Sequence, residues 1–391
     1  MIVKNEESSL PQALNSAKDV VDEMVILDTG STDKTVEIAK AYGARVYQFE
    51  WCNDFSAARN QALQYVQGKW VLVLDADEVL TQPIVPELKQ VIHNEQYLLI
   101  NLIRQEVGAA QSPYSQVSRL FRNHPEVYFS RPYHAIVDDS VVQLLEQEPQ
   151  WRVASLPKVA ILHYGYQPEA IASRDKYNRG VQAMEAFLAE HPDDPYGCSK
   201  LGAFYIGLGQ LGKGIELLER GLRAQQIDAP VLFELHYHLG NAYTRLKNPP
   251  SAAEHYQEAI KQQILPQLKI GAYNNLGNLH FSAGDLTQAR TNYETTVKID
   301  PSFAAGYNNL GMTFKGMGLL EEAIRLYQQA IKCQPDYADA HQNLGVAFLK
   351  KGKVQQSLSA FGKAIALHET HNPTEAKRLR QGLQDMGFPV N

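Results

Sequence analysis

The chain has 391 residues, 44% of them hydrophobic and 20% charged, which is the balance of a globular protein with two or more domains. Its formal net charge of −6, with both signs interspersed, argues against binding nucleic acid or an anionic membrane through bulk charge. The three cysteines are far apart and no apolar run is long enough to span a bilayer, so we expect no disulfide framework, no transmembrane segment and a cytoplasmic location.

Strand-like and helix-like segments alternate from Met1 to about Tyr166. The predicted strands and helices are, in chain order, 24–28, 32–42, 45–49, 54–66 and 70–75. Asp54 is the expected N-cap of the second helix. The last strand, WVLVLD, is almost continuously apolar, as expected for a strand covered on both faces of a parallel sheet. The pattern predicts an open α/β sheet.

Two carboxylates follow that apolar strand, at Asp75 and Asp77. Ligands of open α/β sheets bind at the carboxyl ends of the strands, and paired carboxylates suit a hard divalent cation that neutralises a diphosphate. The alternative is an ordinary acidic turn, because a bare Asp-x-Asp pattern is weak by itself.

A second polar turn, Asp28-Thr-Gly-Ser-Thr-Asp33, ends another strand and opens a helix. Such a turn offers backbone N–H groups and small hydroxyls to a phosphate. Helix capping by its serine, threonine and second aspartate is an equally simple explanation of those three residues, but it does not account for Asp28 and Gly30 together.

Four segments, in this order and spacing, resemble the family 2 glycosyltransferases, and the closest group is the bacterial set fused to tetratricopeptide repeats. The segments are MIVKNEE at 1–7, LDTGSTDKT at 27–35, DFSAARNQAL at 54–63 and WVLVLDADE at 70–78. Later segments, RLFRN at 119–123 and ILHYGY at 161–166, fit more loosely. The resemblance implies a GT-A fold, a nucleotide-diphospho sugar donor with UDP favoured, a Mn²⁺ or Mg²⁺ cofactor, and inversion at the anomeric carbon.

The resemblance also implies roles for individual residues. Those implied to bind the donor are Lys4, Asn5, Glu6, Asp28, Asp33, Arg59 and Asp75. Arg59 lies beside the apolar face of its helix and should be partly buried, so its guanidinium needs an anion. That anion is either the diphosphate of the donor or a carboxylate such as Asp75.

The implied metal ligands are Asp75, Asp77 and His163, with Asp77 the better of the two carboxylates and Glu78 supporting them. Imidazole suits Mn²⁺ better than Mg²⁺. The alternative for His163 is a hydrogen-bonded structural histidine at the end of a strand.

Two features depart from the family pattern. Only Met1–Val3 precede the first loop, where relatives carry more apolar residues, so the true start could lie upstream. Relatives commonly have His-Glu where this chain has His134-Ala135, and that glutamate is the usual acceptor base. The catalytic candidates are therefore His134 and, as replacements for the missing base, Asp138 or Asp139.

The second half is helical and repetitive. Leu-Gly pairs recur at 276, 310 and 344, a period of 34 that resembles the tetratricopeptide repeat. Glycine should let two helices approach while an aromatic side chain fills the gap, and the units must stack into a solenoid. The expected domains are a GT-A domain at 1–166, a connecting helix at 167–194, about five repeats at 195–372, and a capping helix and tail at 373–391.

The residue before each Leu-Gly pair recurs as Asn275, Asn309 and Asn343, in the phase of the inner face of repeats that hold extended peptides. Asparagine both donates and accepts, so these residues are candidates for binding a protein or peptide acceptor, or are merely polar filler. The leading function is glycosyl transfer to a protein, peptide or glycan. The alternatives are a scaffold with a degenerate catalytic half and, less well supported, a nucleotidyltransferase.

Overall fold

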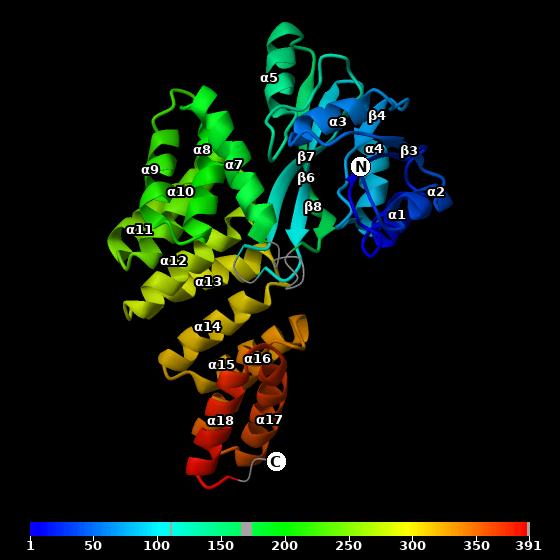
Figure 1. The fold of residues 1–391 in the computed structure, drawn as a ribbon. Helices are drawn as coiled ribbons and strands as arrows, with labels where there is room; N and C mark the ends of the chain where they lie inside the picture. The colour runs from blue at the N-terminus through cyan, green and yellow to red at the C-terminus, as the bar shows by residue number, and fades with distance from the viewer. Residues whose placement is uncertain (110–111, 166–173, 389–391) are drawn as a thin grey trace. The chain divides into compact units, whose positions relative to one another are not determined.

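The computed structural model describes residues 1–109, 112–165 and 174–388 (Figure 1), without the side chains of residues 174–179. Tyr166 and the beginning of the expected connecting helix, residues 167–173, lie outside the described residues. The chain forms two compact units, Met1–Ala242 and Tyr243–Asn391. The division falls inside the predicted repeat array, within helix α10, and the predicted domain limits stay predictions.

A small parallel sheet forms the amino-terminal part of the first unit. Its strand order is β1 (Ile2–Val3), β2 (Val25–Asp28) and β3 (Arg45–Gln48). The helices that connect and follow these strands are α1 (Leu10–Ala17), α2 (Thr35–Ala41) and α3 (Phe55–Leu63). Gly43 ends α2 with a φ of 79°, and the Asp54 side chain caps α3 by accepting a hydrogen bond from the Ala57 N–H.

A five-stranded mixed sheet follows, with the order β4-β7-β6-β8-β5. Its strands are β4 (Trp70–Leu72), β5 (Glu78–Leu80), β6 (Tyr97–Glu106), β7 (Tyr114–Arg122) and β8 (Arg152–His163). Helices α4 (Val85–Val91) and α5 (Asp138–Gln147) lie between these strands in the chain. The expectation that the WVLVLD strand pairs in a parallel sheet is wrong, because β4 pairs antiparallel with β7.

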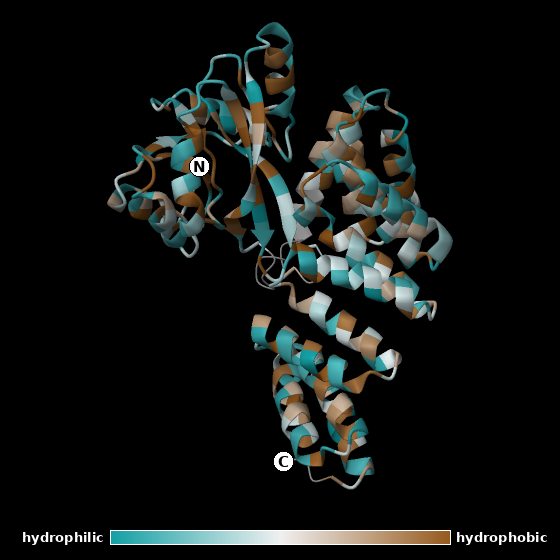
Figure 2. Cartoon of the chain, turned by 180° about the vertical axis from the view of Figure 1, so that it is seen from behind, coloured by the Kyte–Doolittle hydropathy of each residue, from teal (hydrophilic) through white to brown (hydrophobic). Residues whose placement is uncertain are grey.

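Parallel pairing of β4 was wrongly expected because a run of apolar residues indicates that a strand is buried, not in which direction it pairs. Val71 packs into one core cluster with Phe121 and Val141, whereas Leu72 on the opposite face packs against the cluster that contains Ile100 and Leu120. Both faces of β4 are covered, as the sequence predicted. Figure 2 shows the resulting apolar bands along the strands of this sheet.

The first unit also contains helices of the repetitive half. They are α7 (Arg174–Glu190), α8 (Pro195–Gly207), α9 (Leu211–Gly221) and α10 (Ala229–Arg245), of which α10 runs beyond the unit. Arg131, in the loop before α5, donates to Asp194 at the start of α8 over 2.7 Å. The Tyr133 ring lies 5.7 Å from Phe204 of α8. The first helices of the repeat array therefore pack on the α/β part.

The second unit is entirely helical in its described residues. Its helices are α11 (Pro249–Lys261), α12 (Ile270–Ser282), α13 (Leu286–Ile299), α14 (Ala304–Gly316), α15 (Leu320–Cys333), α16 (Ala338–Lys350), α17 (Val354–His371) and α18 (Pro373–Asp385). The expected fit of glycine against an aromatic ring is confirmed: a Cβ added at Gly277 would lie 2.6 Å from Tyr293, and one at Gly311 would lie 2.7 Å from Tyr327. The fold class, α/β followed by a helical repeat array, is as predicted.

The asparagines of the repeats bond to one another across successive units. Asn309 Nδ2 donates to Asn274 Oδ1 over 2.9 Å, and Asn343 Nδ2 donates to Asn308 Oδ1 over 3.0 Å. Asn275 donates to the Tyr256 hydroxyl over 3.3 Å. The predicted peptide-contacting asparagines therefore already serve repeat packing.

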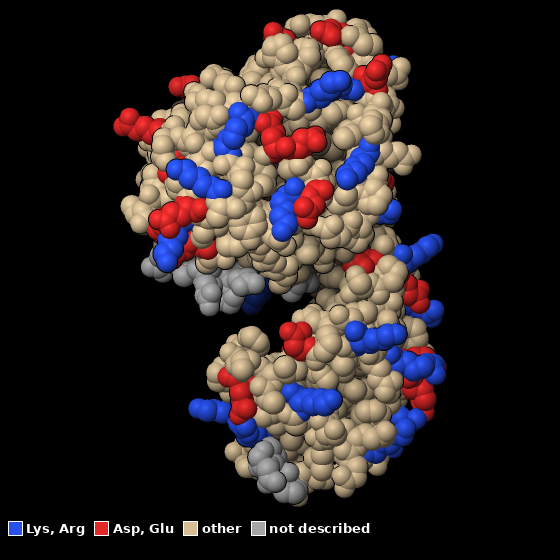
Figure 3. Space-filling view, turned by 90° about the vertical axis from the view of Figure 1, so that its right-hand side faces the viewer, with Lys and Arg blue, Asp and Glu red and all other residues tan. Residues whose placement is uncertain are grey.

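The charge distribution is mixed on the face that Figure 3 shows, where acidic and basic side chains alternate over both parts. Among the described helices, none is both long and apolar enough to cross a lipid bilayer.

Candidate active site

The first loop and the turn after β2 are joined by hydrogen bonds at the carboxyl ends of β1 and β2. The Thr32 N–H donates to Asn5 Oδ1 over 2.8 Å, and the Asn5 N–H donates to the Ser31 hydroxyl over 2.9 Å. The Glu7 N–H donates to Asp33 over 3.1 Å. The structure thus brings together two segments that the sequence assigned to the donor pocket, with Lys4 exposed beside them.

Asp28 is 1% exposed, and its carboxylate accepts from the N–H groups of Gly30 and Ser31 over 3.2–3.3 Å. Gly30 has a φ of 95°, a conformation that glycine adopts without strain. Asp28 and Gly30 together therefore shape the turn. The alternative that Ser31, Thr32 and Asp33 cap the helix is wrong, because α2 begins at Thr35 and its N-cap residue has no side-chain cap hydrogen bond.

Asp75 is held between two arginines. Arg59 of α3 approaches Oδ1 at 2.9 Å and Arg119 of β7 approaches Oδ2 at 2.8 Å. Although burial favours the neutral carboxyl, the charges of Arg119 and Arg59 hold the pKa of Asp75 well below its usual range. Of the two partners that the sequence left open for Arg59, the structure shows the carboxylate.

Asp77 faces His163, a residue 86 positions later in the chain. His163 Nε2 lies 3.2 Å from Asp77 Oδ2, and its Nδ1 lies 2.5 Å from Glu106 Oε2. Burial opposes the charged imidazole, but its hydrogen bonds to Asp77 and Glu106 raise the pKa of His163 to about 9. A carboxylate on Nδ1 fixes the ring so that Nε2 points to the neighbouring carboxylate, the usual support of a metal-binding histidine.

Strand register explains this meeting. Glu78 of β5 pairs with His163 of β8, and His163 pairs on its other side with Glu106 of β6. Arg104, two residues before Glu106 on β6, binds both Glu78 at 3.0 Å and Glu106 at 2.8 Å. Arg119, which binds Asp75, also lies 3.8 Å from Glu78 Oε1, so one continuous network of ion pairs links Arg59 to Asp77.

Sequence reasoning missed Arg104 and Glu106 and gave Arg119 no role. Arg119 stood in a segment that fits the family, RLFRN, but nothing in that segment pointed to Asp75. Arg104 and Glu106 are two apart in an apolar strand, LINLIRQE, where two charges of opposite sign on one face are unusual. That anomaly was the available signal.

The three predicted metal ligands do not converge, because the arginines occupy Asp75. Within the described residues, no group of three or more His, Cys, Asp and Glu side chains is arranged to hold a metal ion. Asp77 and His163 remain as a pair, and the Gly165 backbone packs directly against them: a Cβ there would lie 2.5 Å from His163 Nε2 and 3.2 Å from Asp77 Oδ2, so only glycine fits this position. One carboxylate and one imidazole fit a cation whose other ligands are phosphate oxygens and water.

The candidates for the acceptor base differ in their partners. Asp139 is bound by Arg131 at 2.6 Å and contacts the Ser130 hydroxyl. Asp138 accepts from the Ser118 hydroxyl over 2.8 Å through Oδ1, while Oδ2 is buried without a hydrogen-bond partner among the described residues. Burial raises the pKa of Asp138. His134 is exposed and has a left-handed φ of 53°.

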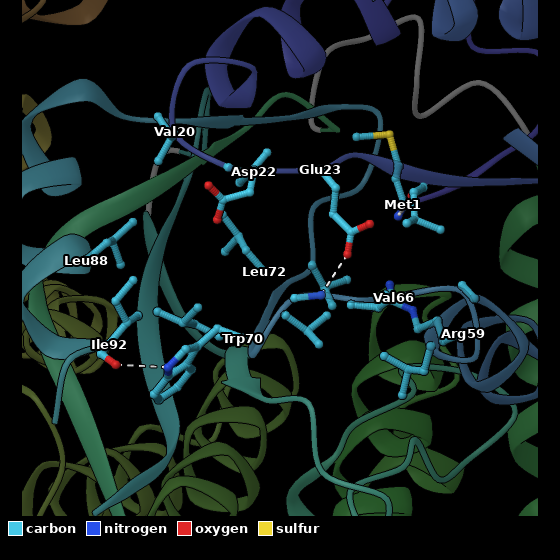
Figure 4. Close-up of a pocket in the computed structure, with 18 of the residues that line it drawn as sticks. Met1, Val20, Asp22, Glu23, Arg59, Val66, Trp70, Leu72, Leu88 and Ile92 are labelled. Atoms are coloured by element: carbon cyan, nitrogen blue, oxygen red, sulfur yellow. Dashed lines mark hydrogen bonds between the residues drawn. The ribbon is translucent and has the colours of Figure 1, made fainter. Parts of the chain in front are cut away.

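A cavity of about 190 Å³ lies between the two sheets and is lined mainly by apolar side chains (Figure 4). Met1, Leu72, Trp70 and Val66 surround it, and Arg59 lies at one side. Neither Asp77 nor His163 lines it. A sugar nucleotide needs polar partners for its phosphates, so this cavity is not the site that the acidic side chains form.

Comparison with known proteins identifies the families of the two halves of the chain. The family described as Glycosyl transferase family 2 matches residues 1–151, and tetratricopeptide repeat families match residues 233–263, 277–318 and 316–352. A TPR repeat-containing protein of Synechococcus elongatus is 42% identical over 73% of this chain and 71% of its own length.

Two further relatives are named glycosyltransferases. The SPbeta prophage-derived glycosyltransferase SunS of Bacillus subtilis is 28% identical over 50% of this chain, and the match spans 46% of SunS. An uncharacterized glycosyltransferase of Rickettsia bellii is 27% identical over 47% of this chain and 65% of its own length. Residues 1–151 therefore belong to glycosyl transferase family 2, and tetratricopeptide repeats follow them in the same chain.

Proposed function

We propose that the protein transfers a sugar from a nucleotide-diphospho donor, with UDP as the favoured nucleotide, to a hydroxyl of a protein, peptide or glycan acceptor, with inversion at the anomeric carbon. The observation that carries the proposal is the meeting of Asp77 and His163 beside Gly165. A divalent cation, Mn²⁺ or Mg²⁺, would supply the positive charge that stabilises the departing diphosphate.

The protein's own groups support the other parts of the reaction. The loop of Asn5 and the turn of Asp28 form the wall against which the nucleotide binds. Arg59 Nε and Nη1 and Arg119 Nη1 are buried without hydrogen-bond partners among the described residues, and a diphosphate beside Asp75 would give these N–H groups acceptors.

Asp138 is the best candidate for the acceptor base, because Asp139 is bound by Arg131 and Asp138 keeps an oxygen without a partner. A raised pKa makes a carboxylate a stronger base once it is ionised. Asp138 would accept the proton of the acceptor hydroxyl as that oxygen attacks the anomeric carbon. We place the reaction in the cytoplasm, and assign the repeats to acceptor or partner binding.

A thermal-shift series tests the donor site. UDP or GDP with Mn²⁺ should raise the unfolding midpoint, because a ligand that binds only the folded state stabilises it by mass action. The Asp77→Asn and His163→Ala variants should lose the metal-dependent part of that shift, each measured against its own unliganded midpoint. His163→Ala should lower the unliganded midpoint, because it removes a partner of the buried Glu106 carboxylate. If none of the nucleotides changes the unfolding midpoint of the wild type, with or without metal, the protein is better explained as a degenerate scaffold. A panel of nucleotide sugars scored for hydrolysis would identify the donor.

A further inference from the structure

A charged pair lies on the first helices of the repeat array. Lys200 of α8 places Nζ 2.5 and 2.7 Å from the two carboxylate oxygens of Glu234 on α10. The Ser199 hydroxyl donates to the same carboxylate over 3.1 Å, and Lys200 Nζ lies 4.9 Å from the centre of the Tyr196 ring. Both charged side chains keep contact with solvent, 20% exposed for Lys200 and 33% for Glu234.

This pair is next to the loop that carries His134-Ala135, where relatives commonly have His-Glu. The Tyr196 hydroxyl donates to the His134 carbonyl over 3.2 Å, and the His134 ring lies 5.7 Å from Phe204 of α8. Arg131 of the same loop binds Asp194 at the start of α8. The first repeat helices thus hold the His134 loop, which lies one residue from where relatives supply a glutamate.

Electrostatic coupling connects the pair to the ion-pair network of the candidate active site. Although the His134 side chain is exposed, desolvation by the protein around it and then the charges of Lys200, Arg104 and Arg119 lower the pKa of His134, while Glu234 acts on it in the opposite direction. The charge of Arg104 also acts on Lys200.

A purely structural ion pair is the competing explanation. Lys351 and Glu321 also form an ion pair between repeat helices, α15 contributing Glu321 and the residue after α16 contributing Lys351, and there Glu321 is 59% exposed. The Lys200–Glu234 pair is less exposed to solvent than the Lys351–Glu321 pair, so its formation carries a larger desolvation penalty. A contact that only holds two helices together does not require such a penalty. Because the pair lies against the His134 loop, a role in acceptor binding would explain why the penalty is tolerated.

We propose that Lys200 and Glu234 bind the acceptor, and that the acceptor is a sugar residue. This inference rests on the proposed transferase function and names its acceptor class. A carboxylate accepts hydrogen bonds from two neighbouring hydroxyls, an ammonium donates to a third, and the exposed His134 ring offers a surface for the C–H face of a pyranose. A carbohydrate presents that combination of groups, whereas an extended peptide presents its backbone N–H and C=O groups.

The test separates acceptor binding from donor chemistry. We compare the wild-type protein with the variants Glu234→Gln, Lys200→Met and Lys200→Arg. The first assay measures hydrolysis of UDP-sugars with Mn²⁺. The second measures transfer to methyl β-glycosides of glucose, galactose and N-acetylglucosamine, and the third measures transfer to a pool of peptides that contain serine and threonine. Saturation-transfer NMR measures glycoside binding without turnover. Glu321→Gln and Lys351→Met are the matched controls.

Glu234→Gln and Lys200→Met should raise the KM for the glycoside about tenfold or more and leave donor hydrolysis unchanged, and Lys200→Arg should recover part of the loss. Unchanged glycoside KM and binding in both variants, or transfer to the peptide pool alone, would overturn the inference. Absence of donor hydrolysis in the wild type would count against the proposed function, while NMR would still decide glycoside binding. If Glu234→Gln lowers the unfolding midpoint, Ser199→Ala, which removes one hydroxyl contact to Glu234, replaces it.

Discussion

The α/β part and the repeats of residues 243–388 bury different things. The α/β part buries charge: Glu78 is 0% exposed and Glu106 6%, and both bind Arg104. The repeats bury closely packed apolar side chains, because an aromatic ring fills the space that each Leu-Gly glycine leaves. Several of their ion pairs join residues three or four apart on exposed helix faces, where such pairs contribute little. Buried ion pairs thus characterise the candidate active site, and packing of an aromatic ring against a glycine characterises the repeats.

Breaking the charge network at its solvent-facing end should have the largest effect. Asp77→Asn removes a carboxylate that faces His163 and should lower sugar transfer by about 10³-fold, because electrostatic stabilisation of the leaving diphosphate is lost. The free energy of unfolding should change by less than about 1 kcal/mol, since Asp77 is 31% exposed. Steady-state kinetics and chemical denaturation measure the two. Asp19→Asn, at an exposed residue, is the control.

Asp138→Asn should separate activity from stability. Loss of the base should lower transfer by about 10²-fold. The folded-state pKa of Asp138 is raised, so the ionised carboxylate is disfavoured in the folded protein, and this cost is present above that pKa and disappears below the unfolded value. The variant should therefore unfold at a higher temperature than wild type at pH 8, and the gap should close towards pH 4.

Asp139→Asn is the matched control for that experiment. It weakens the ion pair with Arg131, so its unfolding midpoint should fall at pH 8. A stabilised Asp138→Asn that retains full transfer would remove Asp138 as the base.

Overfilling the repeats should affect stability alone. Gly311→Ala places a methyl group 2.7 Å from the ring of Tyr327, which is 0% exposed, and should cost about 2 kcal/mol of unfolding free energy. Gly362→Ala, at a helical glycine with open space around it, should instead stabilise by up to about 1 kcal/mol. Denaturant titration followed by circular dichroism measures both. Equal effects of the two substitutions would contradict the packing argument.

The smallest effect is expected from the asparagine contacts between repeats. Asn309→Ala removes the hydrogen bond to Asn274 and should cost about 1 kcal/mol. Replacing Asn275, Asn309 and Asn343 together tests whether these side chains also bind an acceptor. A loss of acceptor binding at a temperature where all variants are folded would show a role beyond repeat packing, and unchanged binding would leave them purely structural.

The sequence by itself determined the two architectures. The Leu-Gly spacing predicted the repeats, because their contacts recur at a fixed separation along the chain. The polar turns after β2 and β4 placed Asp28, Asp75 and Asp77 at strand ends for a similar reason: strand and turn patterns are local. The resemblance to the family rested on these same local segments.

Only the tertiary structure decided which charges meet. The pairing of β5, β8 and β6 brings Glu78, His163 and Glu106 side by side, and no local pattern encodes a register between strands so far apart in the chain. It also gave Asp75 to two arginines, made β4 antiparallel to β7, and placed Lys200 beside the His134 loop. Burial and periodicity follow from neighbouring residues, whereas strand direction and ion-pair partners depend on how distant segments pack.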